Sequence, residues 1–394
     1  MHQVWLDGGA ESVRALSAAL ADALGGGEAV LPLDSRYPGA AGLRDAMCPD
    51  DPVEPGAAVL VTTSGTTGTP KGVLLSADAL RASAAATHSR IGGPGTWLLA
   101  TPAQYIGGLQ VLVRSLVAGT TPGVLDLAGG FRPDAFAEAA APVLRADGPR
   151  YTALVPTQLT RLLDAGGAGL AAVRDFDAVI IGGAAISSEL RARASGSGLR
   201  VIGAYGMSET ASGCIYDGVP LDGVRVHLTS ADGRQAGQLM IAGDVLALGY
   251  RGDPETTREV FRGGWFHTSD IGRIGEDGRI EVLGRTDDVI NTGGVKVPAG
   301  IVESALLEHS GVAEACVVSL PNAEWGEIVA AAIIPADPDH PPAQAELTLL
   351  VRRRAGPAAV PKLIRPFAKF PSRGPGKVDR AALRADLERH VGER

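Results

Sequence analysis

The sequence has few lysines, few cysteines and no long apolar run. Only five of its 36 basic residues are lysines, so arginine supplies nearly all of the positive charge. The net charge of −8 and the absence of a basic patch argue against a nucleic-acid partner. The three cysteines, Cys48, Cys214 and Cys316, are scattered without a CxxC pair, which predicts reduced thiols in a cytoplasmic protein.

Other absences exclude further classes of protein. The seven histidines do not cluster, so the pattern gives no transition-metal site. No run of about 18 apolar residues is present, so no membrane span is expected. Residues 1–7 lack the basic and then apolar plan of a signal peptide. A chain of 394 residues, 45% of them hydrophobic, is long for one core and predicts two globular domains.

The sequence does contain a loop rich in glycine and hydroxyl groups, which lies between two apolar runs. It follows Val59-Leu60-Val61 and ends on Lys71. Glycines let backbone N–H groups approach an anion, hydroxyls add donors, and the lysine adds a positive charge. Pro70 before the lysine and Gly72 after it exclude a Walker A loop. We therefore expect a polyphosphate-binding loop rather than a flexible surface turn. The residues expected to contact phosphate are Thr63, Ser64, Gly65, Thr66, Thr67, Gly68 and Lys71.

Strands and helices are predicted to alternate through the middle of the chain. Residues 11–24 have the apolar spacing of a helix, whereas residues 34–55 are rich in proline, glycine and aspartate and are expected to be irregular. Ser76 is expected to cap a helix that begins after it. Residues 102–108 are expected to be a loop and residues 123–127 a strand. Between residues 96 and 204, short apolar runs alternate with helical patterns. This order predicts a mostly parallel α/β sheet whose ligands bind at the carboxyl ends of the strands. From Val224 onward, short strands and turns are expected instead.

The loop T-S-G-T-T-G-T-P-K-G resembles the signature loop of the adenylate-forming superfamily of acyl-CoA synthetases, adenylation domains and luciferases. In that family the loop grips the β- and γ-phosphates of ATP. The resemblance implies an α/β fold with two domains. Residues 1–285 would bind ATP and the acid, with mostly parallel sheets flanked by helices and a small β-rich part. Residues 286–394 would form a smaller, mobile α+β domain that carries a catalytic lysine.

A second stretch, Tyr205-Gly206-Met207-Ser208-Glu209-Thr210, follows a predicted strand. A strand that ends in Tyr-Gly is usually structural, so the pattern alone is weak. By resemblance, Tyr205 stacks on adenine, Ser208 replaces the commoner threonine that contacts phosphate, and Glu209 binds Mg²⁺. The other residues implied to line the nucleotide are Gly183, Ala184, Ala185, Gly206 and Met207.

Two further segments are weak by themselves and gain a role from the resemblance. Asp270 on its own would be read as part of a turn or helix cap, and Arg285 as half of a surface ion pair. In the family, the matching aspartate accepts the ribose hydroxyls and the matching arginine contacts the ribose. Asp287 would be the hinge between the domains, and Ser269 stands where the family usually has glycine.

Near the C-terminus, Lys377 lies in a loop of glycine and proline, where the spacing alone favours a solvated side chain. It matches the family's P-x-x-x-x-G-K motif, which implies the catalytic lysine that stabilises charge building on the α-phosphate. Gly293 and Gly294 resemble the glycine pair that lines the pantetheine tunnel of CoA.

The acid-binding segment is most similar to that of the o-succinylbenzoate–CoA ligases of menaquinone biosynthesis. The similarity rests on Thr101 to Gln110, with Tyr105 as the aromatic gate and Gly108 beside it, and on Arg114. Arg114 interrupts an apolar helical run, so it is expected either to bind a substrate carboxylate or to pair with a protein carboxylate. Relatives usually have a longer segment before the phosphate loop, so a shortened front subdomain is expected.

Several alternatives stay open at this point. ATP, Mg²⁺, CoA and a small carboxylic acid are the implied ligands, and a homodimer is left open. Another aryl- or acyl-CoA ligase, or an adenylation enzyme that loads a carrier protein, would carry the same motifs. A catalytically silent ATP-binding module is the alternative from a different class, although intact Lys71, Glu209, Asp270 and Lys377 argue against it.

Overall fold

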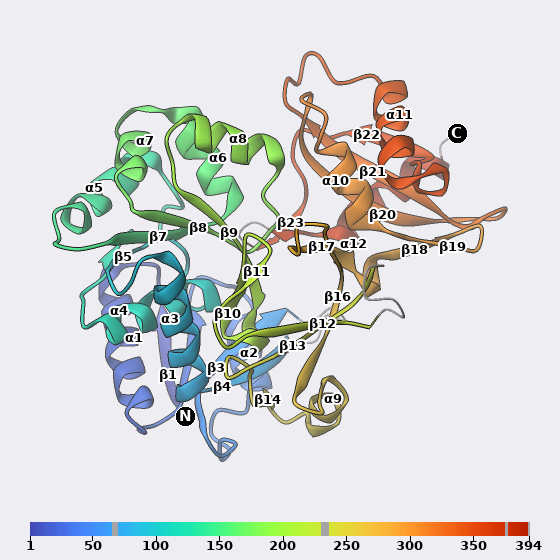
Figure 1. Cartoon of the computed structure of the whole chain (residues 1–394). Helices are drawn as coiled ribbons and strands as arrows, with labels where there is room; N and C mark the ends of the chain where they lie inside the picture. Colours follow the sequence, from blue (N-terminus) through green and yellow to red (C-terminus); the bar gives the residue numbers. More distant parts are fainter. Residues whose placement is uncertain (65–69, 230–235, 375–376, 393–394) are drawn as a thin grey trace. The chain divides into compact units, whose positions relative to one another are not determined.

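A computed structural model describes residues 1–64, 70–229, 236–374 and 377–392 (Figure 1). The chain divides into two compact units, each described by itself. The first comprises Met1–Ile186, Arg193–His227 and Met240–His267, and the second Ser187–Ala192, Leu228–Leu239 and Thr268–Arg394. The expected domain boundary between residues 285 and 286 stays a prediction. In the described part of the chain, no helix combines the length and apolar character that crossing a membrane requires.

The first sheet of the first unit contains the strand before the predicted phosphate loop. Its order is β1-β2-β3-β4-β14, with β1 to β3 parallel, and β4 antiparallel to both β3 and β14. These strands are β1 (His2–Leu6), β2 (Val30–Asp34), β3 (Ala57–Ser64), β4 (Pro70–Ser76) and β14 (Gly249–Tyr250). Helix α1 (Ala10–Leu24) confirms the predicted apolar spacing. The expectation of an irregular segment at residues 34–55 is wrong in part, because α2 (Ala40–Ala46) lies within it.

The second sheet has seven strands in the order β11-β10-β9-β8-β7-β5-β6. From β6 to β9 the strands are parallel, and β9, β10 and β11 are antiparallel, so the predicted mostly parallel α/β sheet is confirmed. Its strands are β5 (Thr96–Leu99), β6 (Gly123–Val124), β7 (Arg150–Leu154), β8 (Ala178–Ile181), β9 (Val201–Met207), β10 (Ser212–Tyr216) and β11 (Val219–Pro220).

Helices connect the parallel strands of this sheet, as Figure 1 shows. They are α4 (Ile106–Ala118), α5 (Pro133–Leu144), α6 (Pro156–Ala165), α7 (Gly167–Arg174) and α8 (Ser188–Gly196), whereas α3 (Ala77–Ile91) leads from β4 of the first sheet into β5. The predicted cap at the start of α3 is confirmed, since the Ser76 hydroxyl accepts a hydrogen bond from the Ala79 N–H at 3.0 Å. Helices α3 and α4 pack against each other.

Short strands follow, as expected from residue 224 onward. They are β12 (Arg225–Leu228), β13 (Gly237–Ala242), β15 (Phe261–Arg262) and β16 (Trp265–Ile274), with α9 (Pro254–Val260) before β15. The chain passes from the first unit into the second along β16. There β16 pairs antiparallel with β17 (Ile280–Arg285), and Asp270 stands opposite Arg285.

The rest of the second unit is an α+β domain. Its sheet has the order β19-β18-β21-β20, with β22 parallel to β21. Its elements are η2 (Thr286–Asp288), β18 (Val289–Thr292), β19 (Val295–Pro298), α10 (Ala299–Leu306), β20 (Val312–Asn322), β21 (Gly326–Pro335), α11 (Gln344–Ala355), β22 (Leu363–Pro366), β23 (Ser372–Gly374), β24 (Lys377–Val378) and α12 (Arg380–Gly392). One core cluster joins the sheet to α10 and α11, and a second joins it to Leu383 and Leu387 of α12.

Candidate active site

The hairpin of β3 and β4 holds the two ends of the predicted phosphate loop. Thr63 stands opposite Lys71 in the ladder, and its hydroxyl donates to the Lys71 carbonyl oxygen at 3.4 Å. The Lys71 Nζ lies 5.0 Å from the centre of the Tyr250 ring, on the neighbouring strand β14. Gly65, Thr66, Thr67 and Gly68 lie outside the described residues, as does the Ser64 side chain. Phosphate contacts of this loop therefore stay a prediction.

Glu209 follows β9 in the short helix η1 (Ser208–Thr210), at the carboxyl end of a parallel strand. The Tyr250 hydroxyl donates a hydrogen bond to Glu209 Oε1 at 2.9 Å. The structure thus connects Lys71 and Glu209, which sequence motifs predicted separately, through one tyrosine of the same unit. Ser208 is buried, with 7% of its surface exposed.

A strained turn follows Glu209. Ala211 and Ser212 have φ angles of 48° and 100°, a region of backbone conformation that residues other than glycine seldom adopt. Such residues cost of order 1–3 kcal/mol each and persist only where their surroundings hold them. Here Ser83 Oγ of α3 and Gln110 Nε2 of α4 both donate to the Ala211 carbonyl oxygen at 2.9 Å. Two helices therefore fix the backbone that positions Glu209.

The predicted adenine-lining residues lie at the ends of two adjacent strands. Gly183, Ala184 and Ala185 follow β8 and are exposed, and Tyr205, Gly206 and Met207 end β9, which pairs with β8. Gly206 is required by packing, because a Cβ there would clash with the Ser212 carbonyl oxygen of β10. The sheet presents these residues at its carboxyl edge, where α/β sheets bind ligands.

The predicted acid-binding residues lie on and before α4. Tyr105 precedes the helix and is 45% exposed. Gly108 has a packing reason of its own, because a Cβ there would clash with the Pro102 carbonyl oxygen. Residues 106–108, expected to be loop, are the first turn of α4.

Arg114 is the most buried charged side chain that the sequence singled out, with 2% of its surface exposed. Its guanidinium stacks on Trp97, with Cζ 5.0 Å from the ring centre. Among the described residues, no carboxylate lies within ion-pair distance of it, and its Nε has no hydrogen-bond partner. Burial lowers the pKa of Arg114 from its ordinary value. The predicted alternative, a pair with a protein carboxylate, is therefore not seen in the part of the chain that the structure describes.

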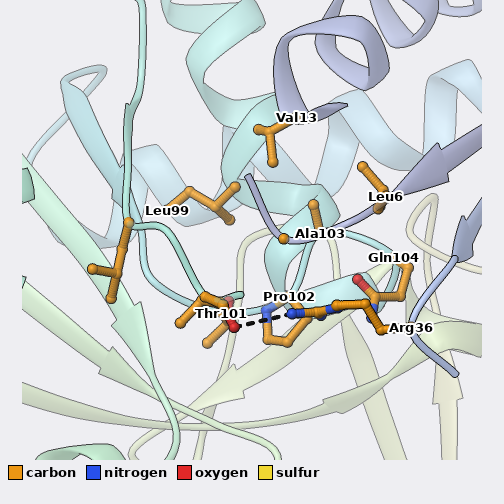
Figure 2. A pocket seen from close by; sticks show the side chains of 11 residues that line it. Leu6, Val13, Arg36, Leu99, Thr101, Pro102, Ala103 and Gln104 are labelled. Atoms are coloured by element: carbon orange, nitrogen blue, oxygen red, sulfur yellow. Dashed lines mark hydrogen bonds between the residues drawn. The ribbon is translucent and has the colours of Figure 1, made fainter. Parts of the chain in front are cut away.

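A small cavity lies close to this segment. Figure 2 shows its lining, which includes Leu6, Arg36, Leu99 and Thr101. Its volume of about 10 Å³ has room for one water, and the Thr101 hydroxyl that lines it is buried without a hydrogen-bond partner among the described residues. A larger pocket, about 520 Å³, is lined by Thr96 and by residues 120–123, 142, 143, 146 and 147, none of which is a predicted site residue.

In the second unit, Asp270 and Arg285 face each other across β16 and β17. Asp270 is part of a strand, so reading it as a turn or a helix cap would have been wrong. Its N–H donates to the Thr268 hydroxyl at 2.9 Å. Arg285 Nη1 lies 4.0 Å from Asp270, and its Nη2 lies 3.1 Å from Asp287. Burial opposes the charge of Arg285, but the bond to Asp287 and the charge of Asp270 raise its pKa.

Gly293 and Gly294 form the two-residue turn between β18 and β19. Their φ angles of 58° and 81° are those of a type I′ hairpin turn, which glycine adopts without strain. A Cβ on Gly293 would also approach the Trp325 ring to 2.6 Å. The backbone conformation of the turn therefore explains why glycine occupies both positions, and their role in CoA binding stays a prediction.

Lys377 opens β24, and its side chain lies outside the described residues. Three residues later, Arg380 forms a network that joins the start of α12 to three other elements, η2, α10 and β20. Its Nη2 lies 2.8 Å from Glu303 of α10, its Nε 3.6 Å from Asp288, and its Nη1 donates to the Val317 carbonyl oxygen at 2.7 Å. This network thus holds the start of α12, three residues after Lys377.

Comparison with known proteins identifies the family. Residues 12–251 match the AMP-binding enzyme family, and residues 301–377 match the AMP-binding enzyme C-terminal domain. The chain belongs to the AMP-binding enzyme family.

Individual relatives agree with this assignment. The chain is 44% identical over 337 residues to a probable 2-succinylbenzoate–CoA ligase of Mycobacterium tuberculosis, covering 85% of each chain. It is 32% identical over 353 residues to the 2-succinylbenzoate–CoA ligase of Geobacillus kaustophilus, covering 84% of this chain and 69% of that protein. The structure of ATP-bound MatB from Rhodopseudomonas palustris superposes with a TM-score of 0.79 at 26% identity, covering 98% of this chain and 89% of that chain.

An AMP-binding enzyme needs groups that hold the nucleotide, and the first unit offers a fitting set for magnesium polyphosphate. The described residues contain no group of three or more acidic, histidine or cysteine side chains that could hold a metal by themselves. Mg²⁺ in phosphate-transferring sites is commonly held by one or two carboxylates together with phosphate oxygens and water. Glu209, oriented by Tyr250 and lying near Lys71, fits that arrangement.

No sequence motif identified Tyr250 or Arg380 as a residue that supports the site of this AMP-binding enzyme. The hydrogen bond of Tyr250 to Glu209 spans 41 residues, so no local spacing could reveal it. Arg380 lies close to the predicted lysine motif, and that proximity was the available signal. Its partner Glu303 is far away in the sequence and could not be identified from it.

Proposed function

We propose that this AMP-binding enzyme is an AMP-forming acid–CoA ligase that converts 2-succinylbenzoate, ATP and CoA to 2-succinylbenzoyl-CoA, AMP and pyrophosphate in menaquinone biosynthesis. The observation that carries the proposal is Arg114, a buried guanidinium without a carboxylate partner among the described residues, on the helix that follows the acid-binding segment. The 44% identity to a probable 2-succinylbenzoate–CoA ligase supports the same substrate.

The reaction has two steps. A carboxylate oxygen of the acid attacks the α-phosphorus of ATP, forming the acyl-adenylate while the bond to pyrophosphate breaks. The CoA sulfur then attacks the acyl carbon, a C–S bond forms, AMP leaves, and the thiol proton passes to solvent. Binding and orientation, rather than covalent participation of the protein, supply most of the catalysis in such phosphoryl chemistry.

In the first step, Lys377 would stabilise the charge that builds on the α-phosphate. Lys71 and the loop from Thr63 to Gly68 would hold the β- and γ-phosphates. Mg²⁺, when bound with ATP at Glu209, supplies neutralisation of phosphate charge. Tyr205 would cover the adenine and Ser208 would contact phosphate.

Other residues would bind the ribose and the second substrate. Asp270 would accept hydrogen bonds from the ribose hydroxyls, and Arg285, 4.0 Å from Asp270, would contact the ribose. Asp287, which pairs with Arg285, would be the hinge about which the C-terminal domain turns. The turn at Gly293 and Gly294 would line the tunnel for the pantetheine arm of CoA.

Substrate recognition follows from the chemistry of the acid. 2-Succinylbenzoate has two carboxylates, and the one that is not activated must be held. A buried guanidinium suits this task through charge-assisted hydrogen bonds, which water can bridge. Tyr105 and Gly108 would shape the entrance for the aromatic ring.

A panel of acids tests the proposal. Pyrophosphate exchange into ATP should depend on 2-succinylbenzoate and exceed that with simple benzoates and fatty acids, and thioester should form with CoA. Lys377→Ala should suppress acyl-adenylate formation far more than transfer to CoA from preformed adenylate. Exchange with another acid would assign another ligase, transfer only to a carrier protein would assign an adenylation enzyme, and no exchange with any acid would indicate a silent ATP-binding module.

A further inference from the structure

Tyr250 touches both of the groups that the proposed function assigns to polyphosphate and its metal. Its hydroxyl donates to Glu209 Oε1 at 2.9 Å, and Lys71 Nζ lies 5.0 Å from the centre of its ring. Only 8% of Tyr250 is exposed, whereas Lys71 is half-buried. One side chain therefore makes a hydrogen bond to the carboxylate and offers an aromatic face to the ammonium group.

The backbone around Tyr250 is held on three sides. Strand β14 pairs antiparallel with β4, and Tyr250 stands opposite Val73, two residues beyond Lys71. The Tyr250 N–H donates to the Thr257 hydroxyl at 2.9 Å. The Ala247 N–H donates to the Glu209 carbonyl oxygen at 2.9 Å. Residues 247–250 thus contact both the backbone and the side chain of Glu209.

We propose that Tyr250 is a positioning residue for magnesium polyphosphate: its hydroxyl orients the Glu209 carboxylate, and its ring places the Lys71 ammonium. The inference rests on the proposed function, which takes Glu209 and Lys71 as the binding groups. A carboxylate whose one oxygen accepts a hydrogen bond presents its other oxygen to a cation in a fixed direction. Partners that orient metal ligands in this way commonly change metal affinity about 10- to 100-fold when they are removed.

The hydrogen bond to Glu209 and the ring contact with Lys71 can be removed in two steps. Tyr250→Phe deletes the hydroxyl and keeps the ring, and Tyr250→Leu deletes both. A cation–π contact contributes about 0.5–1 kcal/mol at a partly exposed site, which corresponds to a roughly two- to fivefold change in affinity. Loss of the hydrogen bond to Glu209 should therefore change the Mg²⁺ dependence of ATP binding. Loss of the ring contact with Lys71 should change the affinity for ATP itself.

The measurement is calorimetric titration of the full chain with ATP at a series of Mg²⁺ concentrations. Tyr250→Phe should raise the half-saturating Mg²⁺ concentration by about 10- to 100-fold and leave ATP binding without Mg²⁺ unchanged. Tyr250→Leu should also weaken ATP binding without Mg²⁺ by roughly two- to fivefold. Tyr151→Phe is the matched control, because that buried hydroxyl bonds to the Gly93 carbonyl oxygen at 3.1 Å and touches neither Lys71 nor Glu209.

A second arm separates positioning from a structural role. If the hydroxyl acts through Glu209, adding Tyr250→Phe to a Glu209→Gln variant should cause no further loss of magnesium response. Equal magnesium dependence in Tyr250→Phe and the parent, or losses that add in the double variant, would overturn the inference. The titration needs neither acid nor CoA, so a wrong assignment of the acid leaves its outcome unaffected.

Discussion

Two arginines, one in each unit, stand in opposite surroundings. Arg114 of α4 is 2% exposed, and no carboxylate pairs with it among the described residues. The Arg380 side chain of α12 is 35% exposed and lies within 4.0 Å of both Glu303 and Asp288. Burial opposes the charge in each case. It lowers the pKa of Arg114, whereas Glu303 and Asp288 outweigh it and raise the pKa of Arg380.

Under the proposed function, Arg114 is a charge kept for binding, whereas Arg380 is a charge kept for structure. A buried cation costs free energy unless a partner compensates it. Arg380 has its partners within its own unit, so its contribution belongs to the stability of that unit. Arg114 has an aromatic face as its neighbour, so the compensation is expected from the substrate.

The largest expected effect is that of Arg114 on the acid. Arg114→Ala should raise the KM for 2-succinylbenzoate by about 30-fold to several thousandfold, because losing one partner of a buried charged pair costs about 2–5 kcal/mol. The KM for ATP should change little, and Arg114→Lys should recover only part because the planar fork is lost. Steady-state kinetics with each substrate varied in turn measure both constants. A stably folded alanine variant with the parent's response to the acid would make Arg114 structural.

Arg380 should show the converse behaviour in unfolding experiments. Arg380→Met should lower the free energy of unfolding by about 1–3 kcal/mol, since it removes charged hydrogen bonds and leaves the Glu303 carboxylate without its cationic partner. Arg384→Met on the same helix is the matched control, because Arg384 forms an exposed i,i+4 pair with Glu388. That pair is expected to contribute at most about 0.5 kcal/mol. Chemical denaturation of the variants compares them, and equal losses would contradict the assignment.

The surroundings of Arg114 also predict a pH dependence through His88. Burial first, and then the charge of Arg114, lower the pKa of His88 from 6.5 to about 4. The unfolded chain therefore binds more protons than the folded chain between these values, and the free energy of unfolding should fall as the pH drops from 6.5 to 4. Arg114→Met removes the charge and should therefore weaken the dependence of the free energy of unfolding on pH. If denaturation midpoints of His88→Gln follow pH as steeply as those of the parent, another group is responsible.

Arg285 gives the smallest expected effect on stability. It is 41% exposed and pairs with Asp287, which is 50% exposed. Arg285→Ala should change the free energy of unfolding by about 0–1 kcal/mol, as is usual for pairs in contact with water. Arg285→Ala should change the free energy of AMP binding by more than it changes the free energy of unfolding. Thermal denaturation with and without AMP separates the two, and an equal shift in both conditions would argue against a ribose contact.

Local patterns in the sequence predicted much of the fold. The apolar spacing of α1, the Ser76 cap and the alternation through the seven-stranded sheet are confirmed. Strands β1 and β2 were not predicted, since each is five residues long and gains its stability by pairing within the first sheet. The run from Gly123 to Leu127 was predicted as a strand, yet only Gly123 and Val124 pair with β5.

The site was predictable where chemistry lies within one motif. Lys71 and Glu209 each belong to a short motif, and the sequence indicated both. Their connection through Tyr250 depends on the pairing of β14 with β4, which joins segments far apart in the chain. The Gly293-Gly294 pair shows that a motif can also have a purely structural cause, because its turn geometry would require glycine with or without a ligand.

The antiparallel hairpin of β3 and β4 has an electrostatic consequence. A phosphate loop that runs directly into a helix receives the helix macrodipole, equivalent to about half an elementary charge at its N-terminus. Here the chain leaves β3 at Ser64, enters β4 at Pro70, and reaches its next helix only at Ala77. If the loop binds the phosphates as proposed, the formal positive charge that it brings to them is that of Lys71. Unlike a helix dipole, that charge can be abolished by one substitution or by acylation of an amine, so a chemical change at this one side chain should weaken ATP binding.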